Sequence, residues 1–273
     1  MNAETQPNIV ITPRGLSGFA EWRELWKARD LCWFLVRRDL KTRYSQSVLG
    51  LGWAIVQPLF TTGVLSLIFG KLAGIPSDGV PYPIWSLAGV VAWTFFQSAV
   101  NESGNCLAAN IGVITKVYFP RLVLPLAAVG GKMFDLLVML ALLALVLLAA
   151  HGELLLAGCH LQIAALWVVP MALGIVIISA LAGGLWLAGL SVQYRDVRVA
   201  QSLLLQLLMY ATPVIYPASV IFEKHKNIPA IFQQLYFLNP LAGAMENIRS
   251  SLFGTIPISY MHLAMGAVVA VLG

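Results

Sequence analysis

The sequence predicts an all-α integral membrane protein, because it is strongly apolar, poor in charge and divided into long uncharged runs. Of its 273 residues, 59% are hydrophobic and 11% are charged, and the mean hydropathy is +0.81. Soluble domains carry about 25% charged residues. Membrane-spanning strands would give shorter segments of alternating polarity, and no such segments are evident in the sequence. Helices are therefore the elements expected to cross the membrane.

Six helices are predicted to span the bilayer, since about 20 apolar residues are needed to cross a hydrocarbon core of about 30 Å. Five runs without charged residues exceed that length, and one further run contains only Lys132 and Asp135 as charges. The predicted spans are 44–70, 79–101, 122–150, 161–194, 199–222 and 250–273. Residues 44–273 are thus expected to form a six-span membrane domain.

Basic residues assign the two sides of the membrane. Lysine and arginine are concentrated before the first span, between the second and third spans, and between the fourth and fifth spans. The remaining connections hold few of them. By the positive-inside rule, both termini and the even-numbered connections are expected to be cytoplasmic. This topology accounts for the net charge of +5, so we expect no nucleic-acid partner.

The chain before the first span divides into two parts. Residues 1–18 are expected to form a flexible tail. Residues 19–43 place apolar side chains, Trp22 and Trp26 among them, on one helical face and charged side chains on the other. This pattern predicts an amphipathic interface helix at the cytoplasmic membrane surface. Both a simple lipid anchor and a platform for a cytoplasmic partner fit it.

The second span is unusually polar and aromatic for a membrane helix. Polar groups at membrane depth usually face the interior of a bundle or a water-filled path. Aromatic rings beside amides suit sugars, which offer an apolar face and hydroxyl edges. We therefore expect a substrate conduit here, with an interfacial aromatic belt as the alternative. The candidate conduit residues are Trp93, Phe95, Phe96, Gln97 and Asn101.

The third span carries two charges, Lys132 and Asp135, one helical turn apart. A lone charge at the bilayer centre costs about 2.5–3.5 kcal/mol on insertion scales, so such residues tend to pair or to face water. Positions i and i+3 of a helix are neighbours. We expect an intramembrane ion pair that faces a neighbouring span, and the alternative is a contact with substrate or with a gate.

Two prolines in the stretch 212–217, "TPVIYP", are expected to end the fifth helix near the far side of the membrane. The following segment, 218–253, is apolar but is interrupted by polar residues such as Glu246 and Arg249. Broken backbone at membrane depth is tolerated where protein or a cavity surrounds it. The sequence therefore predicts a re-entrant helical hairpin between the fifth and sixth spans.

Motifs of stand-alone catalysis are missing from the sequence. It contains no G-x-x-x-x-G-K-[ST] phosphate loop, no H-E-x-x-H and no G-x-S-x-G. Its three cysteines, Cys32, Cys106 and Cys159, lack metal-ligand spacing. We expect no catalytic residue, metal site or cofactor in this chain. Energy for any work must come from an ion gradient or from another subunit.

Five stretches in order resemble the membrane subunits of type-2 ABC exporters that secrete O-antigen, capsule and teichoic-acid polysaccharides. They are "RRDLKTRYSQSVLGLGWAIVQPLF", "KVYFPRLVLPL", "LSVQYRDVR", "ATPVIYP" and "LNPLAG". The resemblance covers residues 20–273. It implies a homodimeric permease in the bacterial inner membrane, docked on two copies of a separate P-loop ATPase that bind ATP and Mg²⁺. The implied substrate is a lipid-linked polysaccharide.

The resemblance also implies roles for individual residues. The interface helix and the loop between the second and third spans would receive the movements of the ATPase. The ATPase-coupling residues would be Trp22, Trp26, Lys116, Tyr118, Phe119, Pro120 and Arg121. Near the cytoplasmic face, Arg37, Arg38 and Arg43 would attract the diphosphate of the lipid carrier.

Three alternatives stay open at the level of sequence. The first keeps the architecture and changes the cargo to a drug or a lipid. The second is an ion-coupled secondary transporter that uses Glu102, Lys132 and Asp135, although such proteins often show internal repeats and none is evident here. The third is a scaffold that anchors a cytoplasmic complex through its tryptophan-rich helix.

Overall fold

The computed structural model is a bundle of helices, and it describes residues 24–45, 49–116, 119–156, 158, 162, 165–224, 230–255 and 257–273. Within these ranges there is no β-strand, so the all-α fold class is confirmed. The predicted tail, residues 1–18, lies outside the described residues.

The helices keep one order along the chain. They are α2 (Arg29–Ser45), η1 (Gly50–Gly52), α3 (Trp53–Leu65), η2 (Ser66–Leu72), α4 (Tyr82–Ala109), α5 (Ile111–Ile114), α6 (Val123–Ala149), α7 (His151–Leu156), α8 (Val168–Gln193), α9 (Val197–Ala211), α10 (Ala218–Lys224), α11 (Ala230–Phe237), α12 (Pro240–Phe253) and α13 (Tyr260–Leu272).

Four helical segments are long and apolar enough to cross a membrane. They are Gly50–Leu72, Tyr82–Ala109, Val123–Ala149 and Val168–Gln193, and they overlap the first four predicted spans. Helices α9 and α13 are also apolar, but they contain only 15 and 13 residues, fewer than the about 20 that a span needs. The chain is thus a multi-pass membrane protein, while the six-span count and the re-entrant hairpin stay predictions.

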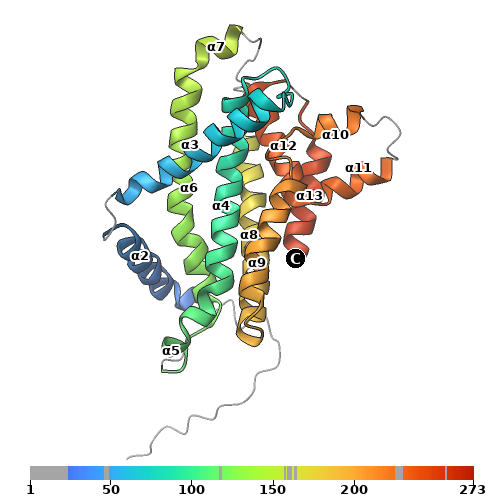
Figure 1. The fold of residues 1–273 in the computed structure, drawn as a ribbon. Coiled ribbons are helices and arrows are strands. Elements are labelled where there is room, and N and C mark those ends of the chain that lie inside the picture. The colour runs from blue at the N-terminus through green and yellow to red at the C-terminus, as the bar shows by residue number, and fades with distance from the viewer. Residues whose placement is uncertain are drawn as a thin grey trace, which may run out of the picture.

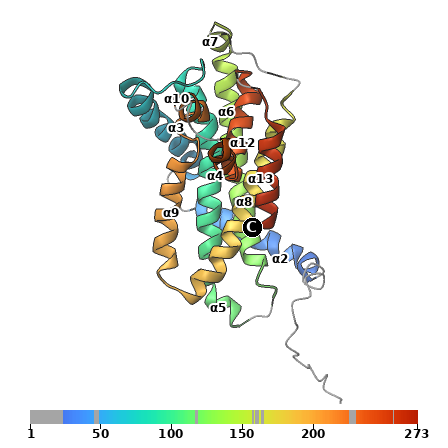
Figure 2. The ribbon, with the colours of Figure 1, turned by 90° about the vertical axis from the view of Figure 1, so that its right-hand side faces the viewer.

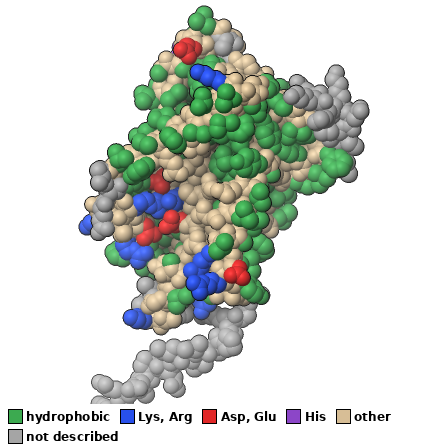
Figure 3. Space-filling view, viewed as in Figure 1, with side chains coloured by type: hydrophobic (Ala, Val, Ile, Leu, Met, Phe, Trp, Pro, Cys, Tyr) green, Lys and Arg blue, Asp and Glu red, His purple; other side chains and the backbone are tan. Residues whose placement is uncertain are grey.

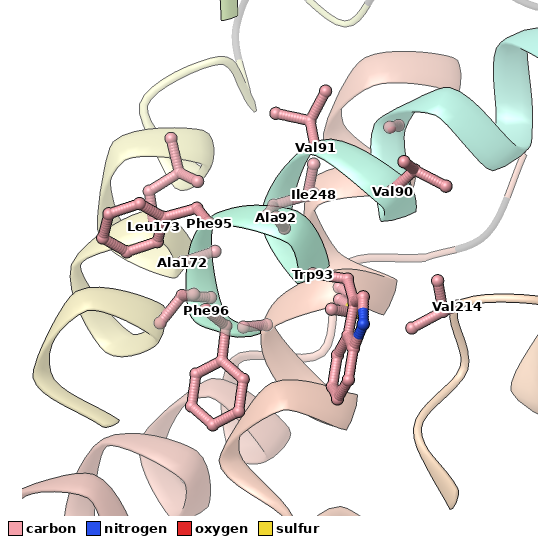
Figure 4. Close-up of a cluster of buried hydrophobic side chains, with 14 of the residues drawn as sticks. Val90, Val91, Ala92, Trp93, Phe95, Phe96, Ala172, Leu173, Val214 and Ile248 are labelled. Carbon is pink, nitrogen blue, oxygen red and sulfur yellow. The ribbon is translucent and has the colours of Figure 1, made fainter. Parts of the chain in front are cut away.

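Helix α4 forms the centre of the bundle, with α6 on one side and α8 on the other (Figures 1 and 2). Its apolar residues supply much of the core together with α8 and α12. In Figure 4, Phe95 lies beside Ala172 and Leu173 of α8, and Trp93 lies on the side of Val214. Most side chains of α4 are therefore held by neighbouring parts of the chain.

Helix α3 runs obliquely across the bundle (Figure 1). It contains Pro58 and continues into the π-helix η2. A proline inside a helix removes one backbone hydrogen bond and bends the chain. The α3–η2 segment contacts α4, but little of it is buried.

The segment 212–217 that follows α9 contains no helix. Side chains from α12 and α4 donate hydrogen bonds to its carbonyl groups. Arg249 of α12 donates to the carbonyl oxygens of Pro213 and Val214, the latter at 2.9 Å. The hydroxyl of Tyr82 in α4 donates to the carbonyl of Ile215 at 2.6 Å. These three carbonyl groups, which lie outside any helix, are thereby satisfied inside the protein, as a membrane environment requires.

Arg249 is itself packed on every side. Its guanidinium carbon lies 3.5 Å from the ring centroid of Trp85, and its Nη1 lies 3.9 Å from Glu246 Oε1. The same Glu246 oxygen accepts a hydrogen bond from the backbone N–H of Ala218 at 3.0 Å. Gly89 makes room for the guanidinium, because a Cβ at that position would overlap Arg249 Nη2.

Candidate functional site

A polar cavity of about 350 Å³ opens where α4 faces α2, α3 and α6. Helix α4 lines it with Thr94, Gln97, Ser98 and Asn101, which recur at helical spacing and therefore share one face. Helix α3 adds Trp53, Gln57 and Pro58, and α2 and α6 add charged residues. We call this space the polar cavity. Its lining combines amides, hydroxyl groups and one tryptophan, a set that can hydrogen-bond to a hydroxyl-rich ligand.

Four charged residues from three helices meet at the edge of the polar cavity, and we call them the charge ring: Arg43 of α2, Glu102 of α4, and Lys132 and Asp135 of α6. Arg43 Nη1 lies 2.9 Å from Asp135 Oδ2, and Lys132 Nζ lies 3.4 Å from Glu102 Oε2. Two longer contacts close the ring, Arg43 Nη2 to Glu102 Oε2 at 3.7 Å and Lys132 Nζ to Asp135 Oδ2 at 3.8 Å. Figure 3 shows blue and red side chains side by side in a hollow of this face.

The ring carries two positive and two negative side chains, so its formal charge is zero. The hydroxyl of Tyr44 also donates to Asp135 Oδ1. A balanced ring offers no strong net attraction to a free ion.

The three arginines predicted to attract a diphosphate do not form one cluster. Arg37 and Arg38 are exposed on α2, where Arg37 lies over the ring of Trp33 and Arg38 pairs with Asp39 at 3.0 Å. Arg43 instead belongs to the charge ring. Only Arg37 and Arg38 are therefore placed at the surface, and their role stays a prediction.

The predicted conduit residues separate into two groups. Gln97 and Asn101 line the polar cavity. The three aromatic residues are buried in the single chain, with exposed fractions of 2% for Trp93, 0% for Phe95 and 7% for Phe96. The indole N–H of Trp93 donates to Gln97 Oε1 at 3.1 Å, so this ring positions a cavity amide. Contact of Trp93 or Phe95 with a substrate would require the core to open, and that role stays a prediction.

The described members of the predicted ATPase-coupling set lie at the α2 end of the bundle, where α5 is also found (Figure 1). Trp26, Lys116 and Arg121 are exposed, and Phe119 and Pro120 are half-buried. Trp22 and Tyr118 lie outside the described residues. A small apolar cluster of Leu35, Val36, Cys106, Val123, Leu124, Ala127, Ala128 and Ala188 holds α2 at this end, and Phe119 packs against it. Helix α2 and the loop before α6 thus share one core.

Sequence reasoning missed Gln201 of α9, which is buried beside the polar cavity. Its amide nitrogen donates to the carbonyl of Val100 and to Asn101 Oδ1, both at 3.0 Å. Gly104 makes room for it, since a Cβ there would lie 2.6 Å from Gln201 Oε1. The available signal was a glutamine on the leucine-rich fifth run, one of two there, the other being the exposed Gln206. Its effect is to tie α9 to the helix that lines the cavity.

In the part of the chain that the structure describes, no group of three or more His, Cys, Asp and Glu side chains is arranged to hold an ion.

The fold and the site define a class: a multi-pass helical membrane protein of the transporter kind, with a polar cavity inside its bundle and the helix α2 packed at one end. Residues 30–253 match the family model described as ABC-2 type transporter. The chain therefore belongs to the ABC-2 type transporter family, and the resemblance drawn from its five sequence stretches is confirmed at this level. Relatives of the chain include proteins named as export permeases.

Three relatives are similar along most of their length. The chain is 29% identical over 252 residues to the O-antigen export system permease protein RfbA of Myxococcus xanthus, covering 92% of this chain and 91% of the relative. The corresponding RfbA of Klebsiella pneumoniae is 27% identical over 248 residues, 89% of each chain. The polysialic acid transport protein KpsM of Escherichia coli is 24% identical over 235 residues, 85% of each chain.

Proposed function

We propose that this permease exports a lipid-linked polysaccharide of the O-antigen type from the cytoplasm across the inner membrane. The observation that carries the proposal is the similarity to O-antigen export permeases over about nine-tenths of the chain. A relative named for polysialic acid transport points to the same broad class of cargo, a long glycan.

The polar cavity supports a glycan as the cargo. Gln57, Gln97 and Asn101 offer amide donors and acceptors, which match the hydroxyl groups of a sugar. Trp53 is exposed and can stack on the apolar face of a sugar ring. The formal charge of the charge ring is zero, so the ring neither strongly attracts nor strongly repels a glycan of low or moderate charge. A drug or a simple lipid would leave these polar groups without partners.

The size of the cavity supports a dimer. At about 350 Å³ the cavity of one chain lies at the lower end of the range for small-molecule pockets, about 300–1,000 Å³. A polymer needs a continuous path, which two chains facing one another can provide. In the proposed complex two copies of the chain face one another, and the glycan passes between them along the amide-bearing faces of α4. Opening of this path would expose Trp93 and Phe96.

Transport is proposed to draw its energy from two copies of an ABC ATPase, which bind ATP and Mg²⁺. Closure of the ATPase dimer would push on α2 and on the loop 116–121, where Trp26 and Lys116 are exposed. Arg37 and Arg38, on the exposed face of α2, would attract the diphosphate of the lipid carrier. Because α2 and this loop share an apolar core through Phe119, they would move together.

The proposed topology has six crossings with both termini in the cytoplasm. Exposed Arg195 and Arg198 mark the turn between α8 and α9, which Figure 1 places at the same end as α2 and α5. This clustering of basic groups supports a cytoplasmic end. Helices α9 and α13 would provide the fifth and sixth crossings, and α10 to α12 would form the re-entrant hairpin near the exit.

One observation favours a second candidate, an ion-coupled transporter. Lys132 and Asp135 lie inside a candidate span, and buried charges of this kind often mark ion pathways. The family match favours ATP-driven transport. The two candidates differ in their response to an ionophore, which abolishes ion-coupled transport and leaves ATP-driven transport intact when ATP is maintained.

Deletion of the gene tests the proposed cargo. The expected result is a lipid-linked glycan that accumulates inside the cell, with loss of the surface polymer and recovery on complementation. Normal surface polymer in the deletion strain would contradict the proposal, and accumulation of a different solute would redirect the assignment of cargo.

A further inference from the structure

We infer that the charge ring couples α2 to the membrane helices by an exchange of partners, in which Arg43 leaves Asp135 for Glu102 as α2 moves. The inference rests on the proposed function, because it needs an ATPase that moves α2. Arg43 and Glu102 are then positioning residues for transport and not substrate contacts.

The geometry contains two complete pairings of the same four groups. The short pairing joins Arg43 to Asp135 at 2.9 Å and Lys132 to Glu102 at 3.4 Å. The long pairing joins Arg43 to Glu102 at 3.7 Å and Lys132 to Asp135 at 3.8 Å. Each cation thus already lies within 4 Å of both carboxylates, and a small displacement of α2 suffices to favour the other pairing.

Exchange leaves no charge without a partner. Breaking a simple two-residue ion pair inside a protein would strand both ions in a medium that solvates them poorly. In the ring, Lys132 pairs with Asp135 as Arg43 turns to Glu102, so each charged group keeps a partner of opposite sign in both pairings. A two-state element with a small energy gap is what a switch between two conformations needs.

The packing of α2 provides a pivot for the movement. Val36 is buried against α6, where a Cβ on Gly130 would lie only 3.1 Å from Val36 Cγ2. Arg43 lies about two turns further along the same helix. A rotation of α2 about the Val36 contact would therefore displace Arg43 much more than the buried part of the helix.

Space for the exchange exists beside Glu102. A second cavity of about 370 Å³ lies between α2, α4 and α6, and Arg38, Asn101, Glu102 and Asn105 contribute to its lining. Glu102 is 47% exposed by its side chain, against 15% for Asp135. The carboxylate of Glu102 thus borders the second cavity and can follow the guanidinium group, whereas the less exposed Asp135 stays paired with Lys132 on its own helix.

The test compares Glu102→Gln with a matched control, Glu153→Gln on the exposed helix α7, in the complete complex with its ATPase. Glu102→Gln removes the partner that Arg43 needs after the exchange. We expect the complex to assemble and to hydrolyse ATP near the wild-type rate, while the amount of polymer exported per ATP falls by about tenfold. Glu102→Asp should restore much of the export, and the control should match the wild type.

Two results would overturn the exchange. Export by Glu102→Gln at the wild-type ratio to ATP would show that Arg43 does not need Glu102. A loss of export in proportion to lost complex or lowered melting temperature would show that the ring only stabilises the fold. If the wild-type complex itself shows no ATP-dependent export, the proposed function fails first, and that outcome is distinct from both.

A distance measurement keeps the inference testable if Glu102→Gln does not fold. Spin labels at the exposed positions Lys41 of α2 and Leu137 of α6 report the relative position of the two helices. The distance distribution should differ between the nucleotide-free and the ATP-trapped complex. An identical distribution in a complex that exports polymer would overturn the inference.

Discussion

Arg249 shows at the scale of one residue how this membrane protein keeps a charge inside its core. Two backbone carbonyls, a carboxylate and the face of Trp85 surround the guanidinium group. Removing one partner of a buried charge leaves it uncompensated and costs about 3–5 kcal/mol. Stability should therefore depend on the small residue that leaves space for this side chain.

Replacing Gly89 by alanine should lower the free energy of unfolding by about 1–3 kcal/mol, the usual cost of overpacking a core. The new Cβ would overlap Arg249 Nη2 and displace it from the carbonyls of Pro213 and Val214. Thermal unfolding of the purified protein in detergent measures the effect.

Gly174→Ala in α8 is the matched control, since a Cβ there meets nothing within 4 Å. The Gly89→Ala change should also cost much less in an Arg249→Met background, because the clash disappears and contacting residues do not act additively. Equal costs in both backgrounds would contradict the proposed contact.

Gln201→Ala should destabilise the protein by about 1–3 kcal/mol, because the carbonyl of Val100 and the amide of Asn101 lose a buried hydrogen-bond partner. The exposed Gln206 on the same helix provides the control, for which Gln206→Ala should change stability by less than about 0.5 kcal/mol. Similar melting temperatures for the two variants would argue against Gln201 as the link between α9 and α4.

At the scale of elements, the apolar runs predicted the first four long helices well, because uncharged length is itself the physical requirement for crossing a bilayer. The end of the chain was harder to predict. The helix predicted over 199–222 ends at Ala211 in the structure, and the side chains that make the break tolerable, Arg249 and Tyr82, come from distant parts of the sequence. A hydropathy pattern describes neighbouring residues in the sequence, so it cannot predict such long-range contacts.

The loop before α6 carries the element-scale prediction about coupling. Changing both Tyr118 and Phe119 to alanine should reduce the ATPase that co-purifies with the tagged permease by about tenfold or more, since aromatic anchors commonly contribute 2 kcal/mol or more to an interface. The measurement is a pull-down in mild detergent, with the masses of the recovered proteins.

A double change of Phe232 and Tyr260 to alanine, both exposed aromatic residues on α11 and α13, should leave the recovery of ATPase unchanged. Full recovery of ATPase by the Tyr118 and Phe119 variant would remove this loop from the coupling interface.

At the scale of the whole molecule, topology can be read from accessibility. In a background without Cys32, Cys106 and Cys159, a cysteine at Tyr194 should react with a membrane-impermeant maleimide only from the cytoplasmic side. A cysteine at Gly152, beyond the far end of α6, should react only from outside. Labelling of both positions from one side would contradict the proposed crossings.

The site as a whole could be predicted only in part from the sequence. The polar residues of α4 and the charges of α6 were visible as exceptions within apolar runs, and the structure places Gln97, Asn101, Lys132 and Asp135 around one cavity. The contribution of Arg43 was not visible, because a basic residue beside a membrane span resembles many others there. Its pairing with Asp135 depends on how α2 packs on α6.

The most direct test of the central claim is ATP-dependent glycan transport in inside-out membrane vesicles. Vesicles that contain the permease and its ATPase are supplied with labelled lipid-linked glycan, and the fraction protected from an added glycosidase is measured. The account predicts that ATP produces protected glycan with the wild-type complex, also in the presence of an ionophore, and that an ATPase-inactive complex produces none. Protection that is independent of ATP, or absent although the active ATPase is bound, would contradict it.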